Sequence, residues 1–208
     1  GWDRPLRLAA RGRLQSHLVY ELAIEGGPMR RLQDDAGSWP FKVQVGTDGA
    51  RLRADGALDA RHGTARVQVN ARADDLAPIE RLIGSSLPDF GDASASCTVT
   101  VAADAVQIDG LHGRLGKSEF AGHLTFGFGG ARPRISGTLS AAALDLRPFL
   151  PPSPADGRAI GDGSRADQAL PLRDLVAVDA EVDLKVEQWL GLGVDVRDAS
   201  VAWRSDER

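Results

Sequence analysis

The chain has 208 residues, with 25 basic and 29 acidic side chains mixed along its length and a formal net charge of −4. It has no basic stripe interleaved with aromatic residues, which excludes the usual nucleic-acid footprint. Its single cysteine, Cys97, cannot form an internal disulfide. Cys97 lies within an alternating apolar run, so we interpret it as a small buried apolar residue and not as a nucleophile.

The N-terminal third shows apolar residues at every second position, the period of a half-buried β-strand. Strands are predicted around residues 5–25 (two strands), 41–45, 50–58 and 65–71. Residues 28–40 are expected to be a polar loop, and Thr47-Asp48-Gly49 predicts a hairpin turn. In the segment 65–71, Val67 and Val69 lie on the inward face while Arg66, Gln68 and Asn70 face out.

The period then changes. The segment Asp75–Ile83 begins with a capping Asp, carries Pro78 near its first turn and ends before Gly84, with apolar residues at helical spacing. These signals predict a short helix.

Strands are predicted again at 95–101 and 105–108. The longest regular pattern follows, from residue 114 to residue 150. It contains a strand at 120–128, and Gly129-Gly130 with Arg132-Pro133 turns the chain into a return strand from Ile135. A helical turn is expected near Leu144–Phe149. The stretch Gly110–Ser118 has some likeness to a phosphate-binding loop, but its glycine spacing is one residue out and a strand pattern follows it, so a β-turn is favoured.

Residues 151–168 (PPSPADGRAIGDGSRADQ) contain almost no large apolar side chain and are predicted to be a flexible insert. Strand patterns resume at 176–186 and again from Val194 to Trp203, where a phase shift at Arg197-Asp198 predicts a bulge. A short internal repeat relates residues 73–79 to residues 143–149, each after a hairpin, which is typical of an elongated, stacked β architecture.

Three short motifs, S-E-F-A-G-H-L-T-F (118–126), R-P-R-I-S-G-T-L-S (132–140) and A-L-D-L (143–146), occur in a fixed order and spacing. Together they resemble the recurrent hairpin of the AsmA family of Gram-negative envelope proteins, which is related more distantly to TamB. The resemblance implies an interior piece of a periplasmic protein with an inner-membrane anchor outside this chain, and both ends of the chain fit that expectation. It divides the chain into a repeated hairpin region (1–150), the insert (151–169) and further strands of the same sheet (170–208).

The fold expected is therefore mainly β, an elongated antiparallel sheet curved into an open groove or a splayed sandwich, with one or two short helices. By the resemblance, the inward face would hold phospholipid acyl chains and carry lipid between the inner and outer membranes in outer-membrane biogenesis. The predicted lining residues, each in phase with the inward set of its strand, are Val67, Val69, Val99, Val101, Phe120, Leu124, Phe126, Ile135 and Leu139.

No motif indicates an enzyme, a metal site or a cofactor. The four histidines, His17, His62, His112 and His123, lack metal-ligand spacing, and the Asp34-Asp35 and Asp74-Asp75 pairs lie in no calcium-binding pattern. Two other readings stay open. One is a β-sandwich with a dry core that acts as a scaffold or binding module in envelope assembly. The other, less favoured because the four tryptophans are scattered, is a glycan-binding or glycan-cleaving domain.

Overall fold

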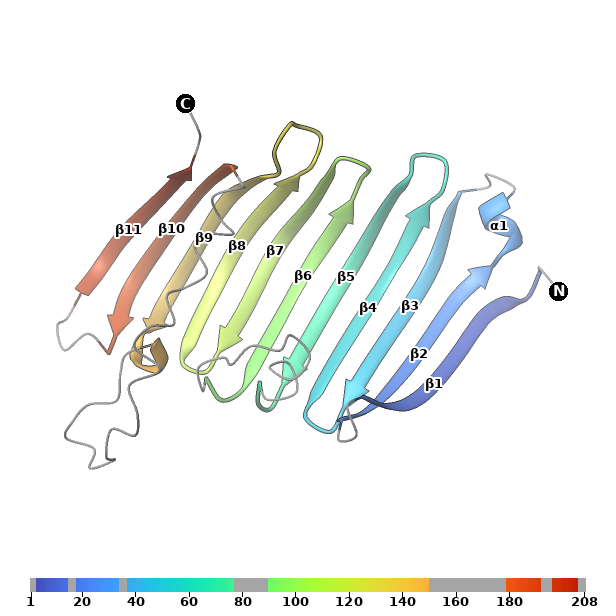
Figure 1. Ribbon diagram of the computed structural model, residues 1–208, viewed down its shortest axis with the longest axis horizontal. Helices are drawn as coiled ribbons and strands as arrows, with labels where there is room; N and C mark the ends of the chain where they lie inside the picture. The colour runs from blue at the N-terminus through green and yellow to red at the C-terminus, as the bar shows by residue number, and fades with distance from the viewer. Residues whose placement is uncertain are drawn as a thin grey trace.

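The computed structural model describes residues 3–14, 18–33, 37–76, 90–149, 179–191 and 196–205. These residues form one sheet of eleven strands, whose spatial order from β1 to β11 is their order in the sequence (Figure 1). The two end strands, β1 and β11, do not pair with each other, so the sheet is open. The predicted mainly-β fold with an open sheet is confirmed.

The strands are β1 (Pro5–Leu14), β2 (Leu18–Pro28), β3 (Ser38–Thr47), β4 (Ala50–Asp59), β5 (Thr64–Ala73), β6 (Ala93–Val101), β7 (Ala105–Leu115), β8 (Ser118–Gly127), β9 (Arg134–Asp145), β10 (Asp179–Leu190) and β11 (Val196–Ser205). Two short helical segments accompany them, α1 (Arg30–Gln33) and the 3-10 helix η1 (Arg147–Phe149). In the described part of the chain, no helix is long and apolar enough to cross a membrane.

Neighbouring strands pair antiparallel throughout the sheet, with one exception. Strand β10 runs parallel to β9, with Asp179 opposite Arg134 and Leu190 opposite Asp145. The sheet is therefore predominantly antiparallel, as expected, with one parallel pair that the sequence did not indicate. A parallel neighbour requires a connection that returns along the full strand length, and residues 146–178 are numerous enough to provide it.

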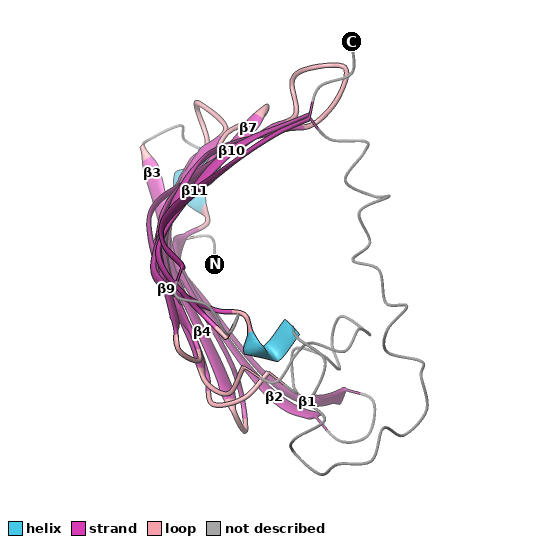
Figure 2. Cartoon of the chain, turned by 90° about the vertical axis from the view of Figure 1, so that its left-hand side faces the viewer, coloured by secondary structure: helices cyan, strands magenta, loops and turns pink. Residues whose placement is uncertain are grey.

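The sheet is curved along its strands into a trough, which Figure 2 shows almost end-on. It forms a single layer, and among the described residues no second sheet faces it. Consequently the apolar residues with less than a tenth of their surface exposed are few and mostly small: Ala73, Ala141, Ala180 and Val186. A splayed sandwich, the second form of the predicted fold, is not what the described strands build.

Bulges interrupt the ladders at defined points. In β7 the pairs Ile108–Leu124 and Leu111–Gly122 differ in register by one residue, and Gly110 has a φ of 57°. A left-handed glycine is the usual solution for an extra residue in a strand. The bulge reverses the phase of β7, so that Ile108 and Leu111 face the same side of the sheet.

The phase shift predicted at Arg197-Asp198 is also present. Asp198 has a φ of 52° and no partner in the ladder, and Glu187 beside it on β10 is unpaired too. Because both strands hold one unpaired residue at this level, the register on either side stays the same. Val196 and Ala199 therefore lie on one face, although they are three positions apart in β11 and regular alternation would place them on opposite faces.

The local predictions mostly agree with the structure. The hairpin turn after Thr47 and the helical turn near Leu144–Phe149 (as η1) are confirmed. Gly110–Leu115 belongs to β7, and the turn that follows is only Gly116-Lys117. The expected loop at 28–40 is wrong in part, because it contains α1 and because Trp39 extends β3 by donating its Nε1–H to the Gly27 carbonyl at 2.9 Å. Most of the predicted helix at 75–83, and the whole insert 151–168, lie outside the described residues.

Candidate functional site

The register of the sheet lines up apolar side chains across strands that are far apart in sequence. Paired residues share a face in a β-sheet, so a chain of pairs traces one continuous surface. Three such rows on the same face are Leu8–Ile24–Val43–Ala54–Val69–Cys97, then Val67–Val99–Ile108–Leu124, and Val101–Val106–Phe126–Ile135–Ala180. We call this surface the apolar track.

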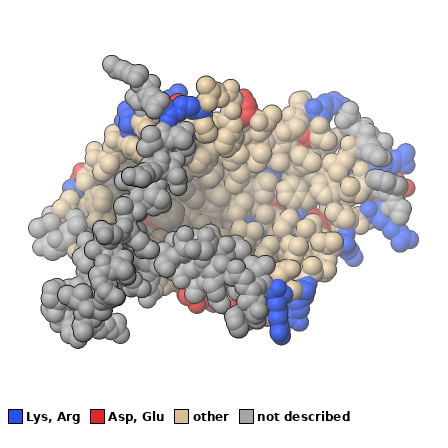
Figure 3. All heavy atoms as spheres, in the orientation of Figure 1, with Lys and Arg blue, Asp and Glu red and all other residues tan. Residues whose placement is uncertain are grey.

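The track lies on the concave side of the trough. The open side of the curve in Figure 2 is the side that faces the viewer in Figure 3, where the hollowed centre carries few charged atoms and Lys, Arg, Asp and Glu gather at the edges. The strands alternate accordingly, so the opposite, convex face holds charged side chains such as Lys42 and Asp55, which form an ion pair at 3.4 Å.

All the predicted lining residues lie on this one face. Val67, Val69, Val99, Val101, Phe126, Leu124 and Ile135 belong to the rows above, and Phe120 and Leu139 join it through their partners Ala141 and Gly122. Their common placement is a finding; their role as lipid-lining residues stays a prediction.

The track contains more residues than the sequence analysis predicted. It also includes residues of the strands at both ends of the sheet, such as Leu22 and Val45 near β1 and Leu184, Val201 and Trp203 near β11. The period of two in those strands already indicates which of their side chains face inward. Only the register shows that these side chains continue the central rows of the track.

Large apolar side chains of the track are exposed to an unusual degree. The exposed fractions are 49% for Leu8, 39% for Leu52, 38% for Val101, 47% for Val201 and 42% for Trp203. Contiguous exposed apolar surface on this scale marks a site for an apolar partner or ligand. The described residues thus leave the concave face without a protein layer over it.

Three aromatic rings of the track lie over glycines of the neighbouring strand. A Cβ placed on Gly12, Gly26 or Gly113 would come within 2.6 Å of the ring of Tyr20, Trp39 or Phe120, respectively. The missing side chain therefore lets each ring lie flat along the sheet, an arrangement that pins register in β-proteins. Trp39 in turn stacks on Phe41, with ring centroids 6.2 Å apart.

Cys97 pairs with Val69 and so belongs to the track. Partial burial raises the pKa of its thiol above the ordinary value, because an apolar surrounding disfavours the thiolate. A thiol of this kind is a poor nucleophile. Its position makes it instead a natural point for attaching a probe to the track.

A buried, hydrogen-bonded polar cluster lies at the end of β9, away from the track. Asp145 is 7% exposed and accepts a hydrogen bond from Arg147 Nε at 2.8 Å, and its backbone N–H donates to Ser118 Oγ at 2.9 Å. Hydrogen bonds from Arg147 hold the pKa of Asp145 below its ordinary value, and the pKa of Arg147 is raised. These groups fix the corner where the chain leaves the sheet. A second pair, Asp59 and His62, closes the turn after β4 with Nδ1 and Oδ2 2.8 Å apart, which lowers the pKa of Asp59.

Within the described residues, no group of three or more His, Cys, Asp or Glu side chains is arranged to hold a metal ion. The track itself offers no polar constellation, so its chemistry is that of apolar contact. No protein-family profile, curated protein or solved structure matches this chain.

Proposed function

We propose that this chain is part of an envelope protein of the AsmA type and that its apolar track holds phospholipid acyl chains in transit between the inner and outer membranes. In this proposal the chain lies in the periplasm, and other parts of the protein anchor it in the inner membrane. It acts without catalysis or cofactor.

One observation carries the proposal: the apolar face is continuous from β1 to β11, concave and exposed. A protein that needed this face for its own core would cover it, because leaving large side chains in water forfeits the main driving force of folding. An acyl chain supplies the missing apolar partner. The hairpin motifs at 118–146 are the reason for placing the protein in the envelope.

The dimensions suit this ligand. Eleven strands spaced about 4.8 Å apart extend the track over about 48 Å. The acyl chains of one leaflet occupy about 15 Å, half of a hydrocarbon core of about 30 Å. The track is therefore long enough for about three acyl chains end to end.

The energetics suit it as well. Complete burial of a chain of ~16 carbons would contribute on the order of 12 kcal/mol, at about 0.8 kcal/mol per methylene. An open trough covers about half of the chain, so roughly 6 kcal/mol is available for each one. This is enough for retention, yet small enough to let the chain move along a surface that has no polar barrier.

The lone cysteine allows a direct test. A benzophenone maleimide attached to Cys97 places a photoreactive group on the track, and mild alkaline pH during labelling offsets the raised pKa of the thiol. After incubation with phospholipid vesicles and irradiation, we expect a covalent lipid adduct in the mass spectrum of the intact protein.

A matched control moves the cysteine to the other face of the same strand. Thr98 is the next residue of β6 and lies on the convex side, so a Cys97→Ser, Thr98→Cys variant carries the same probe pointing away from the track. The adduct should fall at least tenfold. Equal adducts from both positions, or none from either, would contradict a lipid-holding track and favour a scaffold role.

A further inference from the structure

The convex face of the trough carries a charge pattern that the lipid track does not use. Several of its cations form ion pairs with a carboxylate of a neighbouring strand, for example Arg11 with Glu21 at 2.7 Å and Arg134 with Glu181 at 2.7 Å. The register explains the first pair, because Arg11 and Glu21 lie directly opposite each other, with their Cβ atoms about 5 Å apart. Glu181 is a diagonal neighbour of Arg134, two residues beyond its direct partner Asp179.

Strands β4 and β5 break this pattern. Arg51 lies directly opposite Arg72, and Arg53, two residues along β4, lies opposite Asn70. Like charges in directly opposite positions destabilise a sheet. We call Arg51, Arg53 and Arg72 the arginine cluster; all three are exposed, and none forms an ion pair with a carboxylate in the described part of the chain.

The surroundings of the cluster are neutral hydrogen-bonding groups. On one side Gln44 lies opposite Arg53, and on the other side Ser94 and Ser96 of β6 lie opposite Arg72 and Asn70. The convex positions of β6 are all hydroxyl residues, Ser94, Ser96, Thr98 and Thr100. The cluster thus sits on a surface rich in donors.

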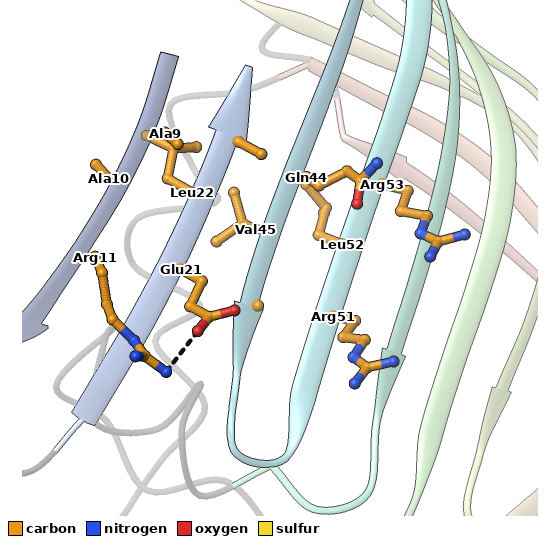
Figure 4. Close-up of a pocket in the computed structure, with 12 residues that line it drawn as sticks. Ala9, Ala10, Arg11, Glu21, Leu22, Gln44, Val45, Arg51, Leu52 and Arg53 are labelled. Carbon is orange, nitrogen blue, oxygen red and sulfur yellow. Dashed lines mark ion pairs between the residues drawn. The ribbon is translucent and has the colours of Figure 1, made fainter. Parts of the chain in front are cut away.

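The surface is also hollowed on both sides of the Arg51–Arg72 pair. One depression, of about 540 Å³, is lined by Arg11, Glu21, Gln44, Arg51 and Arg53. Figure 4 shows that Arg11 is held against Glu21, whereas Arg51 and Arg53 extend from β4 on the side away from Glu21. The other depression, of about 580 Å³, has Arg72, Asn70, Ser94 and Ser96 along one side, with Glu119 and Glu187 among its other lining residues.

We infer that the arginine cluster binds a phosphate-bearing anion. A guanidinium group presents paired N–H donors that match two phosphate oxygens, and the side chains on β4 and β5 can approach one compact anion from both strands. A phosphate with close to two negative charges would relieve the Arg51–Arg72 repulsion, whereas a single carboxylate would offset only half of it. This inference does not depend on the lipid track.

The phosphate could belong to a soluble ion or to a lipid headgroup at a membrane surface, and two probes separate these sources. The first is inorganic phosphate, added at constant ionic strength against chloride while the melting temperature is recorded. The second is flotation with vesicles that contain phosphatidic acid, whose phosphate monoester can carry up to two negative charges, compared with vesicles of phosphatidylcholine.

Two double variants, each removing two positive charges from the convex face, make the test specific. The cluster variant is Arg51→Gln with Arg72→Gln. The control is Arg134→Gln with Lys185→Gln, two exposed convex residues on β9 and β10. Without phosphate we expect the cluster variant to melt no lower than the wild type, since a repulsion has been removed.

With phosphate, the melting temperature of the wild type and of the control should rise, and that of the cluster variant should not. If the cluster variant also no longer binds vesicles that contain phosphatidic acid, the phosphate can come from a lipid headgroup; if its flotation is unchanged, the ligand is the soluble ion. If neither probe distinguishes the cluster variant from the control, or if citrate raises the melting temperature as much as phosphate does, the inference is wrong.

Discussion

A charge placed in the middle of the apolar track separates an open surface from a closed core. Leu124 lies on β8 between Ile108 of β7 and Gly137 of β9, half-buried on the concave face. Complete burial of a leucine contributes about 1.5–3 kcal/mol, so a half-buried one contributes about 1 kcal/mol. In the Leu124→Asp variant that contribution is lost, while the carboxylate can still reach water from an open face.

We therefore expect Leu124→Asp to lower the free energy of unfolding by about 1–2 kcal/mol, measured by urea denaturation. In a closed core the same carboxylate would be buried without a partner, at a cost of several kcal/mol. Although the variant should remain folded, it should lose most of its phospholipid, because acyl chains would have to pass an unpaired charge. Lipid extraction and mass spectrometry of the purified protein measure that loss.

Thr125→Asp is the matched control, since Thr125 is the next residue of β8 and lies on the convex face opposite Gln107. It should keep its lipid and its stability to within about 0.5 kcal/mol. A Leu124→Asp protein that unfolds outright would support a covered, dry core. One that is stable, retains lipid and complements loss of the full-length protein would refute the track on this face.

Three further changes test other parts of the fold. Asp145→Asn should lower the melting temperature at pH 7; because Arg147 depresses the pKa of Asp145 in the folded state, the difference from wild type should persist down to about pH 5 and close as the pH falls through the depressed value. Deletion of residues 151–168 should change the melting temperature by no more than about 2 °C. Gly122→Ala should lower the free energy of unfolding by about 1–3 kcal/mol, because the new Cβ would lie 2.1 Å from the Thr138 carbonyl oxygen.

Each of these has an outcome that would count against it. A pH-independent gap for Asp145→Asn would mean that the carboxylate is not what stabilises the corner. The deletion leaves fifteen residues, with a reach of about 50 Å, between Asp145 and Asp179. The return path along β9 is about 36 Å, so a large loss of stability would show that the insert packs against the sheet. For the glycine, Gly46→Ala is the control, since its nearest contact would be 4.0 Å away and it should be tolerated.

The wide agreement between the predicted and observed strands has a local cause. Side chains alternate between the two faces of a strand with a period of two, so residues 65–71 or 120–128 reveal both the strand and its inward set without reference to any other part of the chain. Turn residues work in the same way, as at Asp48-Gly49. The failures arose where distant contacts decide the structure. Trp39 lengthens β3 by reaching Gly27, and the direction of β10 depends on which strand it joins.

By itself, the sequence determined which residues form strands, which side chains share a face, and that the inward faces are apolar. The tertiary structure alone decided that these faces join into one concave surface instead of facing each other across a sandwich, that β10 lies parallel to β9, and that Arg51 meets Arg72 on the other side. The reason is that periodicity describes a strand relative to its own axis. What lies beside or across from that strand is set by register, bulges and curvature, which depend on residues far away in the chain.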